Sequence, residues 1–362
     1  MSRTSRPPAV DRRTFLHTVA AIGGGALVTA CARNVPGALS ASNAASSTSL
    51  ASLRDRIGLQ LFTVRDRFPA DYAGTLQAVA KIGYKEVQPT LSYGTHTMPQ
   101  IKEYLDRAGL VAPTTHVSPP AGADFERTLD AYAAIGHRYT TVRISTEGRR
   151  GGGGGGQRPA GATDAAPAAA GAATPAPGAA GGAQRAPRPP APPQTLDAVK
   201  RIAAELNDAG RITQKHGLKV IVHNHTVEFA PLADSSQRPY DVFLAETDPS
   251  LVAMELDIGW ATVAGQNALD LFRQAPGRFE VWHVKDIAGL AALKSMTSQA
   301  ERQRAARIVP LGEGEIDYRP IFAQAAQAGM KHFYVEQDSA PQSGDSLAAA
   351  ATSYRNLAKL LA

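Results

Sequence analysis

Residues 219–229 read KVIVHNHTVEF, a short apolar run that ends in histidines and is followed by a glutamate. Three later segments have the same form: VAMELD ends at Asp257, VWH at His283 and FYVE at Glu336. Short apolar runs rich in β-branched and aromatic residues predict buried strands. Because active-site groups gather at the carboxyl ends of parallel strands, this repeated ending indicates one functional edge of a parallel sheet.

Short β-rich runs alternate with helical patterns from Arg56 to the end of the chain, which indicates successive βα units. We expect strands at residues 57–62, 86–89, 112–117, 139–144, 219–225, 252–258, 279–285 and 332–336. We expect helices at residues 72–82, 98–108, 124–135, 195–216, 240–246, 268–274, 318–328 and 346–361, with an irregular region after the seventh strand. Eight such units predict a single-domain α/β protein, a (β/α)8 TIM barrel spanning residues 56–362. An open doubly wound sheet is the alternative, but no Gly-x-Gly-x-x-Gly follows the first strand.

A run of glycine, alanine and proline interrupts this pattern at residues 146–194. It has almost no aliphatic side chains to bury, so we predict a disordered low-complexity insertion in the loop after strand four. A functional lid is the alternative, and composition favours a tolerated linker.

The first 31 residues have the order of an export signal. Arg12 and Arg13 precede Phe15, and an apolar stretch follows at residues 19–30. The arginine pair resembles the twin-arginine signal, which predicts export to the periplasm through the twin-arginine machinery. A basic N-terminus with an accidental arginine pair is the alternative.

Cys31 is the single cysteine, so an internal disulfide is excluded. It ends the segment LVTAC, which resembles a bacterial lipobox, and we expect Cys31 to be lipidated and to anchor the protein to the membrane. A plain cleavage site near Ala30 or Ala32 is the alternative. Residues 40–52 are rich in serine and alanine, and we expect residues 32–55 to form a flexible tether.

The positive charge that gives the chain its formal net charge of +6 lies in the leader and in the predicted insertion. The leader has four arginines against one aspartate, and residues 149–194 have five arginines against one aspartate, which leaves the remainder at −1. A near-neutral barrel disfavours a nucleic-acid partner.

Four ionisable residues follow consecutive late strands, and we expect them to converge on one divalent ion: Glu228, Asp257, His283 and Glu336. A single charged strand end more often caps a helix or pairs with a surface lysine, so the prediction depends on the set. Three carboxylates and one imidazole favour manganese, cobalt or magnesium, and zinc also fits.

Five motifs in order resemble the sugar phosphate isomerase/epimerase family, the xylose isomerase-like TIM barrels. They are GLQLFTVR at 58–65, HNHTVEF at 223–229, LDIGW at 256–260, HVKD at 283–286, and LGEGEID at 311–317 followed by VEQD at 335–338. The resemblance implies the same four ligands. Glu228 is the least certain of them, because it lies past its strand end and His225 competes for the role.

The resemblance implies an isomerase or epimerase that acts on a sugar or keto-sugar through an enediolate. Glu228 and Glu336 are then the candidates for base and returning acid. Lys285 is expected to hold a substrate oxygen, with an ion pair to Asp286 or another carboxylate as the alternative. Export disfavours a phosphorylated substrate.

Three further side chains are candidates for binding the carbohydrate: His116 at the end of strand three, His225, and Trp260 as an apolar wall. Ordinary packing at the rim is the alternative for His116 and Trp260.

Three rival functions are open, and only the first uses the same residues. A metal-dependent dehydratase or lyase acting on a 3-keto-sugar or keto-glycoside begins with the same proton abstraction. A non-catalytic sugar-binding lipoprotein needs no metal. An endonuclease-like phosphodiesterase needs more histidines and a basic groove.

Overall fold

The computed structural model describes residues 50–144 and 194–362 of the chain. The predicted signal, Cys31 and nearly all of the predicted insertion lie outside these residues. The last residues of the predicted tether are part of the fold, because Leu50–Arg54 form helix α1 and Leu53 is buried in the core. The packed structure therefore includes residues upstream of Arg56.

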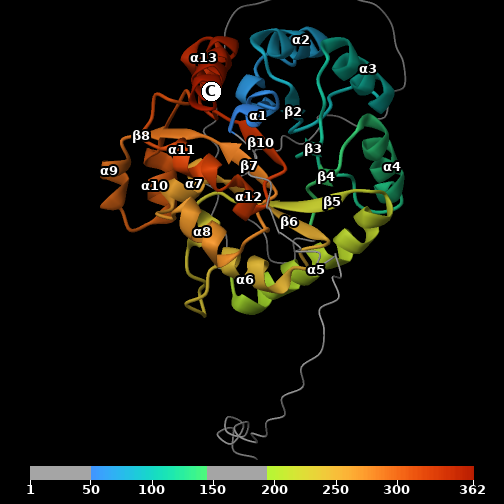
Figure 1. Ribbon diagram of the computed structural model, residues 1–362. Coiled ribbons are helices and arrows are strands. Elements are labelled where there is room, and N and C mark those ends of the chain that lie inside the picture. The colour runs from blue at the N-terminus through green and yellow to red at the C-terminus, as the bar shows by residue number, and fades with distance from the viewer. Residues whose placement is uncertain (1–49, 145–193) are drawn as a thin grey trace, which may run out of the picture. The chain divides into compact units, whose positions relative to one another are not determined.

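Eight strands form one parallel sheet at the centre of the molecule (Figure 1). They are β1 (Gly58–Gln60), β2 (Glu86–Gln88), β3 (Thr114–Thr115), β4 (Tyr139–Thr140), β5 (Lys219–His223), β6 (Val252–Asp257), β7 (Val281–Val284) and β10 (His332–Val335). Their order is β2-β1-β10-β7-β6-β5-β4-β3. β2 and β3 are the two ends of this order, and backbone hydrogen bonds join the segments around them. The N–H group of Val87 donates to the Val111 carbonyl at 2.9 Å, and the N–H group of His116 donates to the Pro89 carbonyl at 2.8 Å. The predicted TIM barrel is confirmed.

Helices surround this sheet in Figure 1. The main ones are α2 (Tyr72–Ile82), α3 (Met98–Ala108), α4 (Phe125–Ile135), α5 (Leu196–Lys215), α6 (Pro239–Glu246), α7 (Ile258–Val263), α8 (Ala268–Gln274), α11 (Tyr318–Ala323), α12 (Ala325–Ala328) and α13 (Ser346–Leu360). α2, α3 and α8 have the predicted bounds. The single helix predicted for 318–328 is divided at Gln324, whose backbone leaves the helical conformation.

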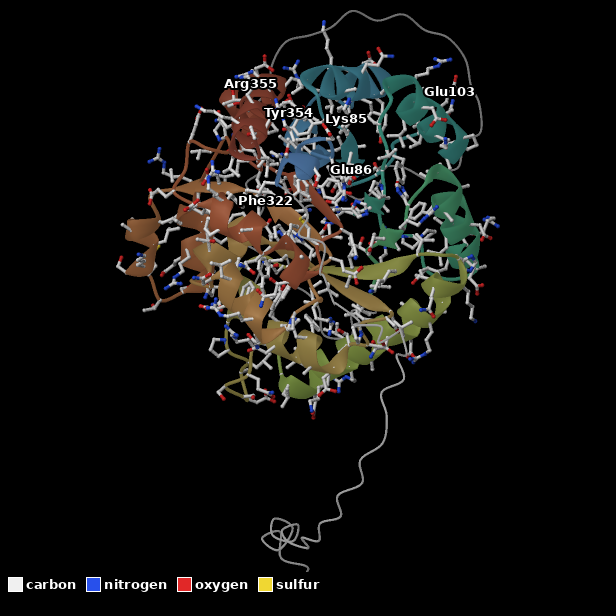
Figure 2. All side chains as sticks on the ribbon, viewed as in Figure 1. Lys85, Glu86, Glu103, Phe322, Tyr354 and Arg355 are labelled. Atoms are coloured by element: carbon white, nitrogen blue, oxygen red, sulfur yellow. The ribbon has the colours of Figure 1, made fainter. Side chains whose placement is uncertain are left out.

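Local capping explains why these bounds are sharp. Thr97 and Gln100 form a capping box at the start of α3. Gly83 ends α2 at φ +127°, and a Cβ there would lie 2.4 Å from the ring of Tyr354, so glycine is required. Tyr354, labelled in Figure 2, packs edge-on against Tyr84 with ring centroids 5.1 Å apart. This contact holds α13 against the first βα unit.

The region after β7, predicted to be irregular, contains an ordered excursion. It consists of β8 (Asp286–Ala288), α9 (Leu290–Lys294), α10 (Gln299–Ala305) and β9 (Arg307–Val309), with β8 and β9 antiparallel. The Asp286 carboxylate accepts N–H groups from Gly312, Gly314 and Ile316 at 2.8–3.2 Å. A Cβ at Gly314 would lie 2.1 Å from Asp286 Oδ1, so the loop after β9 closes only around glycine.

None of the helices in the described ranges is both long and apolar enough to cross a membrane.

Candidate metal centre

Three of the four predicted ligands meet inside the barrel. Asp257 ends β6, His283 lies in β7, and Glu336 follows β10, so three adjacent strands in the sheet bring them together. One ligand atom from each lies within 4.8 Å of the other two. Nδ1 of His283 is 2.7 Å from Oε2 of Glu336 and 3.7 Å from Oδ2 of Asp257.

These same three atoms have no hydrogen bond, although all are buried: Asp257 Oδ2, His283 Nδ1 and Glu336 Oε2. The other carboxylate oxygen of Asp257 accepts the backbone N–H of Trp260 at 2.8 Å, which fixes the side chain and caps α7. Buried polar atoms without partners are costly, and a common cation would satisfy all three. The residues present therefore fit a divalent ion.

Lys285 is the cation that the structure places among these acids. Its Nζ lies 3.0 Å from Asp257 Oδ2, 3.2 Å from Glu336 Oε2 and 2.6 Å from Asp338 Oδ2. Of the two alternatives for Lys285, the structure shows the ion pair with other carboxylates, whereas Asp286 is occupied by backbone N–H groups. Several carboxylates thus share one ammonium in a buried space, an arrangement that a divalent cation would also stabilise.

The pKa shifts have a consistent electrostatic cause. Burial alone would raise the pKa of Glu336 and Asp257, but the Lys285 ammonium and the His283 ring lower both. Burial would lower the pKa of His283, but Glu255 and Glu336 raise it well above its usual value. Burial raises the pKa of Asp338, against the opposing effect of Lys285. Asp257 and Glu336 are thus ionised.

Glu228, the fourth predicted ligand, is placed differently. It lies in the short 3-10 helix η2 (Val227–Phe229), and its Oε2 accepts the backbone N–H of His225 at 2.8 Å. It is not among the described groups whose ligand atoms lie within 4.8 Å of one another. Glu228 and His223 instead line a neighbouring cavity of about 180 Å³ between β5 and α5. Its roles as ligand and as base remain predictions.

The three predicted carbohydrate-binding side chains surround the centre. The His225 ring lies 6.1 Å from Trp260, and Lys285 Nζ lies 4.9 Å from the centroid of the Trp260 ring. Trp260 is 5% exposed, and its buried Nε1 has no partner. His116 is partly exposed, and its ring lies 5.3 Å from that of His283. Burial, with His223 nearby, lowers the pKa of His225 to about 4, so its ring is neutral at neutral pH.

Sequence reasoning missed a second set of polar groups deeper in the barrel. Glu255 is fully buried among His116, His223, His283 and Gln88. A signal for Glu255 was present, because alternate residues of a strand share a face and Glu255 precedes Asp257 by two. For Gln88 we find no comparable signal, since an amide at a strand end is common.

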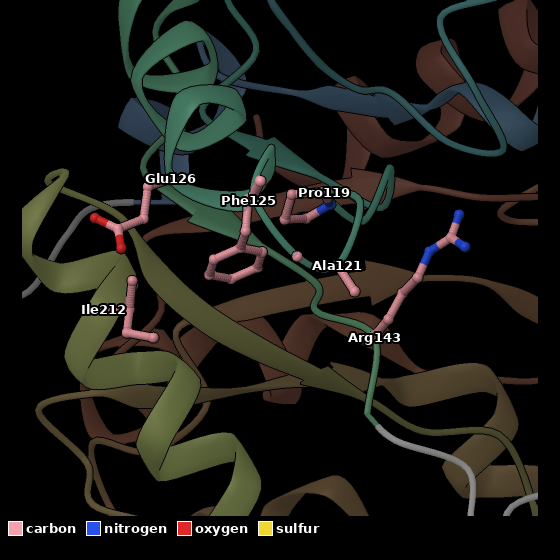
Figure 3. Close-up of a pocket in the computed structure, with 8 residues that line it drawn as sticks. Pro119, Ala121, Phe125, Glu126, Arg143 and Ile212 are labelled. Carbon is pink, nitrogen blue, oxygen red and sulfur yellow. The ribbon is translucent and has the colours of Figure 1, made fainter.

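A cavity of about 400 Å³ lies elsewhere (Figure 3). It is bounded by Pro119, Phe125, Arg143 and Ile212, between the start of α4, the segment after β4, and α5. None of the ligand candidates lines it. Its position gives it no part in the chemistry of the centre.

Known proteins resemble the chain in both sequence and fold. Inosose dehydratase of Clostridium tetani is 27% identical over 156 residues, which cover 41% of this chain and 51% of the relative. The chain thus spans about half the length of the curated relatives it matches. A sugar phosphate isomerase/epimerase structure from Parabacteroides distasonis has a TM-score of 0.58 at 19% identity, covering 83% of this chain and 96% of that one.

A second solved structure carries a metal. The IOLI protein with a bound zinc atom has a TM-score of 0.54 at 12% identity, and the match covers 84% of this chain and 98% of that one. At these identities the solved structures establish the fold alone. The family model described as "Xylose isomerase-like TIM barrel" matches residues 76–360, most of the chain. The chain therefore belongs to the xylose isomerase-like TIM barrel family.

Proposed function

We propose that this protein is a divalent-cation-dependent enzyme that removes the proton beside the carbonyl of an uncharged keto-sugar or keto-polyol, and that loss of water completes the reaction. The observation that carries the proposal is the buried group of three ligand atoms without hydrogen bonds on Asp257, His283 and Glu336, with Lys285 beside them. Loss of water is favoured as the outcome because curated relatives that the chain matches include inosose dehydratases.

Asp257, His283 and Glu336 are the residues that would hold the ion. Two carboxylates and one imidazole suit manganese, cobalt or magnesium, and zinc is compatible with the same donors. When bound, such an ion supplies a Lewis acid that withdraws electrons from a carbonyl group.

The chain's own groups supply charge stabilisation and proton transfer. The Lys285 ammonium is fixed by its carboxylates within the centre, where it can stabilise negative charge that develops on the substrate oxygen. Glu336 and Glu228 are the candidates for taking and returning protons. In the elimination, the C–H bond beside the carbonyl breaks and its proton goes to a carboxylate. The electron pair forms a C=C bond, and the neighbouring hydroxyl leaves with a proton as water.

The surroundings of the centre favour an uncharged substrate. Lys285 is engaged by three carboxylates. Arg65 interacts electrostatically with Asp338 and Glu336. Its guanidinium donates a hydrogen bond to the carbonyl of Phe62 at 2.7 Å and lies 3.8 Å from the centroid of the Phe62 ring. Both cations near the centre thus have partners, whereas Trp260 Nε1 and the neutral His225 offer hydrogen bonds suited to hydroxyl groups.

Isomerisation or epimerisation is the second candidate. The structure from Parabacteroides distasonis, a sugar phosphate isomerase/epimerase, shares the fold, and the reaction begins with the same proton abstraction. It differs only in returning the proton to carbon instead of releasing water.

We also propose that the protein is exported through the twin-arginine machinery and anchored by lipid on Cys31. The order of Arg12, Arg13, the apolar stretch and the LVTAC segment supports this proposal. Fractionation of cells that express the full chain tests it. The Cys31→Ala variant should move from the membrane fraction to the soluble periplasmic fraction, while Arg12→Lys with Arg13→Lys should retain the protein inside the cell.

The reaction is tested with protein stripped of metal and reloaded with Mn2+, incubated with inosose and a panel of free keto-sugars in D2O. Mass spectrometry and proton NMR should show loss of one water. Deuterium incorporation beside the carbonyl without loss of water would establish the isomerase or epimerase instead. Neither change with any substrate, despite bound metal, would contradict both.

A further inference from the structure

Glu255 is a carboxylate with no access to solvent or substrate, since it is 0% exposed in the middle of β6. It lies two residues before Asp257 and therefore points to the same side of the strand, into the barrel. A buried carboxylate is costly unless hydrogen bonds compensate its lost hydration. Its position therefore calls for a set of donors around it.

Two donors reach the Glu255 carboxylate from other parts of the barrel. Gln88 Nε2 donates to Glu255 Oε1 at 2.5 Å, and His116 Nε2 donates to Oε2. His223 Nδ1 lies 3.2 Å from the same Oε2, without a hydrogen bond. Each oxygen of Glu255 thus faces an N–H donor, and Glu255 acts as an acceptor at both.

An acceptor at this position determines which way the Gln88 amide faces. The Gln88 side chain is fully buried, and its NH2 group donates both to Glu255 and to Thr114 Oγ1, at 2.5 and 2.8 Å. With the nitrogen directed at the carboxylate, the oxygen is directed at His283, where Oε1 lies 2.6 Å from Nε2. Turning the amide over would bring its oxygen against the Glu255 carboxylate.

The amide oxygen can only accept, so Nε2 of His283 must carry the hydrogen. The other ring nitrogen, Nδ1, lies on the side of Asp257 and Glu336, and it is the nitrogen that would give up its proton to bind a cation. We propose that Glu255 and Gln88 are positioning residues that act through His283: Glu255 orients the Gln88 amide, and Gln88 fixes His283 with Nδ1 free to bind the cation. The proposal rests on the cation-dependent function proposed above.

A second metal site is the alternative role for these residues. His116, His223, Glu255 and His283 also each place one ligand atom within 4.8 Å of the others, so they could hold a second ion. We favour the positioning role of Glu255 and Gln88 over a second ion. Each Glu255 oxygen already has a donor, and Nε2 of His283 already contacts the Gln88 amide oxygen. The two arrangements predict different numbers of ions bound per chain.

The first test is titration of the full-length protein with Co2+ against a chromophoric chelator. Gln88→Met keeps the length of the side chain but removes its hydrogen bonds, and should weaken Co2+ binding about 10- to 100-fold. Thr114→Val is the matched control, because it removes the other acceptor of the Gln88 amide while leaving Glu255 and His283 in place; its affinity should be unchanged. Circular dichroism establishes that both variants are folded.

The second test reads the tautomer directly in the wild-type protein. Long-range 15N–1H spectra of histidine-labelled, Zn2+-loaded protein should show His283 protonated at Nε2, with its signals identified by their loss in His283→Asn.

Each result supports or overturns the proposal that Glu255 and Gln88 position His283. One ion per chain, weakened binding in Gln88→Met and an Nε2–H tautomer support it. Equal affinity in Gln88→Met and wild type, an Nδ1–H tautomer, or two ions per chain would overturn it while leaving the cation-dependent function intact. No ion bound by the wild-type protein would overturn both.

Discussion

The ammonium of Lys285 lies 3.0 Å from Asp257 Oδ2, one of the three atoms in the centre that lack a hydrogen bond. Lys285 is 1% exposed at its side chain and also contacts Glu336 and Asp338. It therefore partly compensates the carboxylates when no ion is present, and a bound cation would share that role.

Lys285→Met should accordingly destabilise the metal-free protein more than the metal-bound protein. Removing one member of a buried ion pair costs about 3–5 kcal/mol, because the remaining charges lose their partner. Urea unfolding in chelator and in saturating Mn2+ measures the difference. Lys294→Met, at an exposed position of α9, is the control and should have little effect. An equal loss of stability in both conditions would show that no ion shares this charge.

Asp257→Asn should abolish tight metal binding with little change in the fold. Asparagine keeps an oxygen that can accept the Trp260 N–H and cap α7, but loses the negative charge. Because loss of a supporting residue already costs about 10- to 100-fold in metal affinity, loss of a ligand should cost at least that much. Chelator competition measures the affinity, and Asp270→Asn, at an exposed pair with Arg273, is the control. Unchanged affinity in Asp257→Asn would remove Asp257 from the ligand set.

His137 should make the stability of the protein depend on pH between about 6.5 and 4. Its ring is buried and neutral. Nε2 accepts a hydrogen bond from the Tyr93 hydroxyl at 2.6 Å, and Nδ1 donates a hydrogen bond to the Ala112 carbonyl. Burial lowers its pKa from 6.5 to about 4. The unfolded chain therefore binds a proton below pH 6.5 that the folded protein does not bind until about pH 4. The contribution of His137 to the free energy of unfolding is complete above pH 6.5 and decreases as the pH falls through this window.

The slope from this one group is at most about 1.4 kcal/mol per pH unit. His137→Gln cannot be protonated, and the free energy of unfolding of that variant should fall less steeply over the same window. Urea unfolding at several pH values measures both slopes. Identical slopes would show that His137 does not titrate as its burial implies.

Asp286→Ala should loosen the loop after β9. Its carboxylate accepts three N–H groups from residues 312–316, and buried donors left without partners cost about 1–3 kcal/mol each. We expect a loss of roughly 3 kcal/mol in stability and faster cleavage of this loop in limited proteolysis, since part of each penalty is relieved by water. Glu313→Ala, an exposed residue in the same loop, should leave both unchanged.

The architecture was predictable from the sequence because each local signal agreed with the barrel. Asp71 and Gly83 bound α2, and Thr97 and Gly109 bound α3, where the structure has them. The strands are shorter than the apolar runs suggest: the run at 139–144 contains a strand of two residues, β4. Strand ends depend on the neighbouring strand that completes the ladder, and that neighbour is distant in sequence.

The site was predictable only in part, for a related reason. Asp257, His283 and Glu336 end apolar runs, and a common mouth follows from the parallel topology. Glu228 lies in a loop, where sequence does not determine the direction of a side chain, and the structure directs its carboxylate to the backbone of His225. The contact of Gln88 with both Glu255 and His283 joins β2, β6 and β7 and cannot be read from any one segment.

The central claim is that one divalent ion binds between Asp257, His283 and Glu336. Anomalous diffraction from crystals grown with Co2+ and measured at the cobalt edge tests it most directly. We predict a single strong peak bonded to Asp257 Oδ2, His283 Nδ1 and Glu336 Oε2, which is absent in Asp257→Asn. Crystals that contain cobalt in solution but show no peak there, or show it only at another group of residues, would contradict the account.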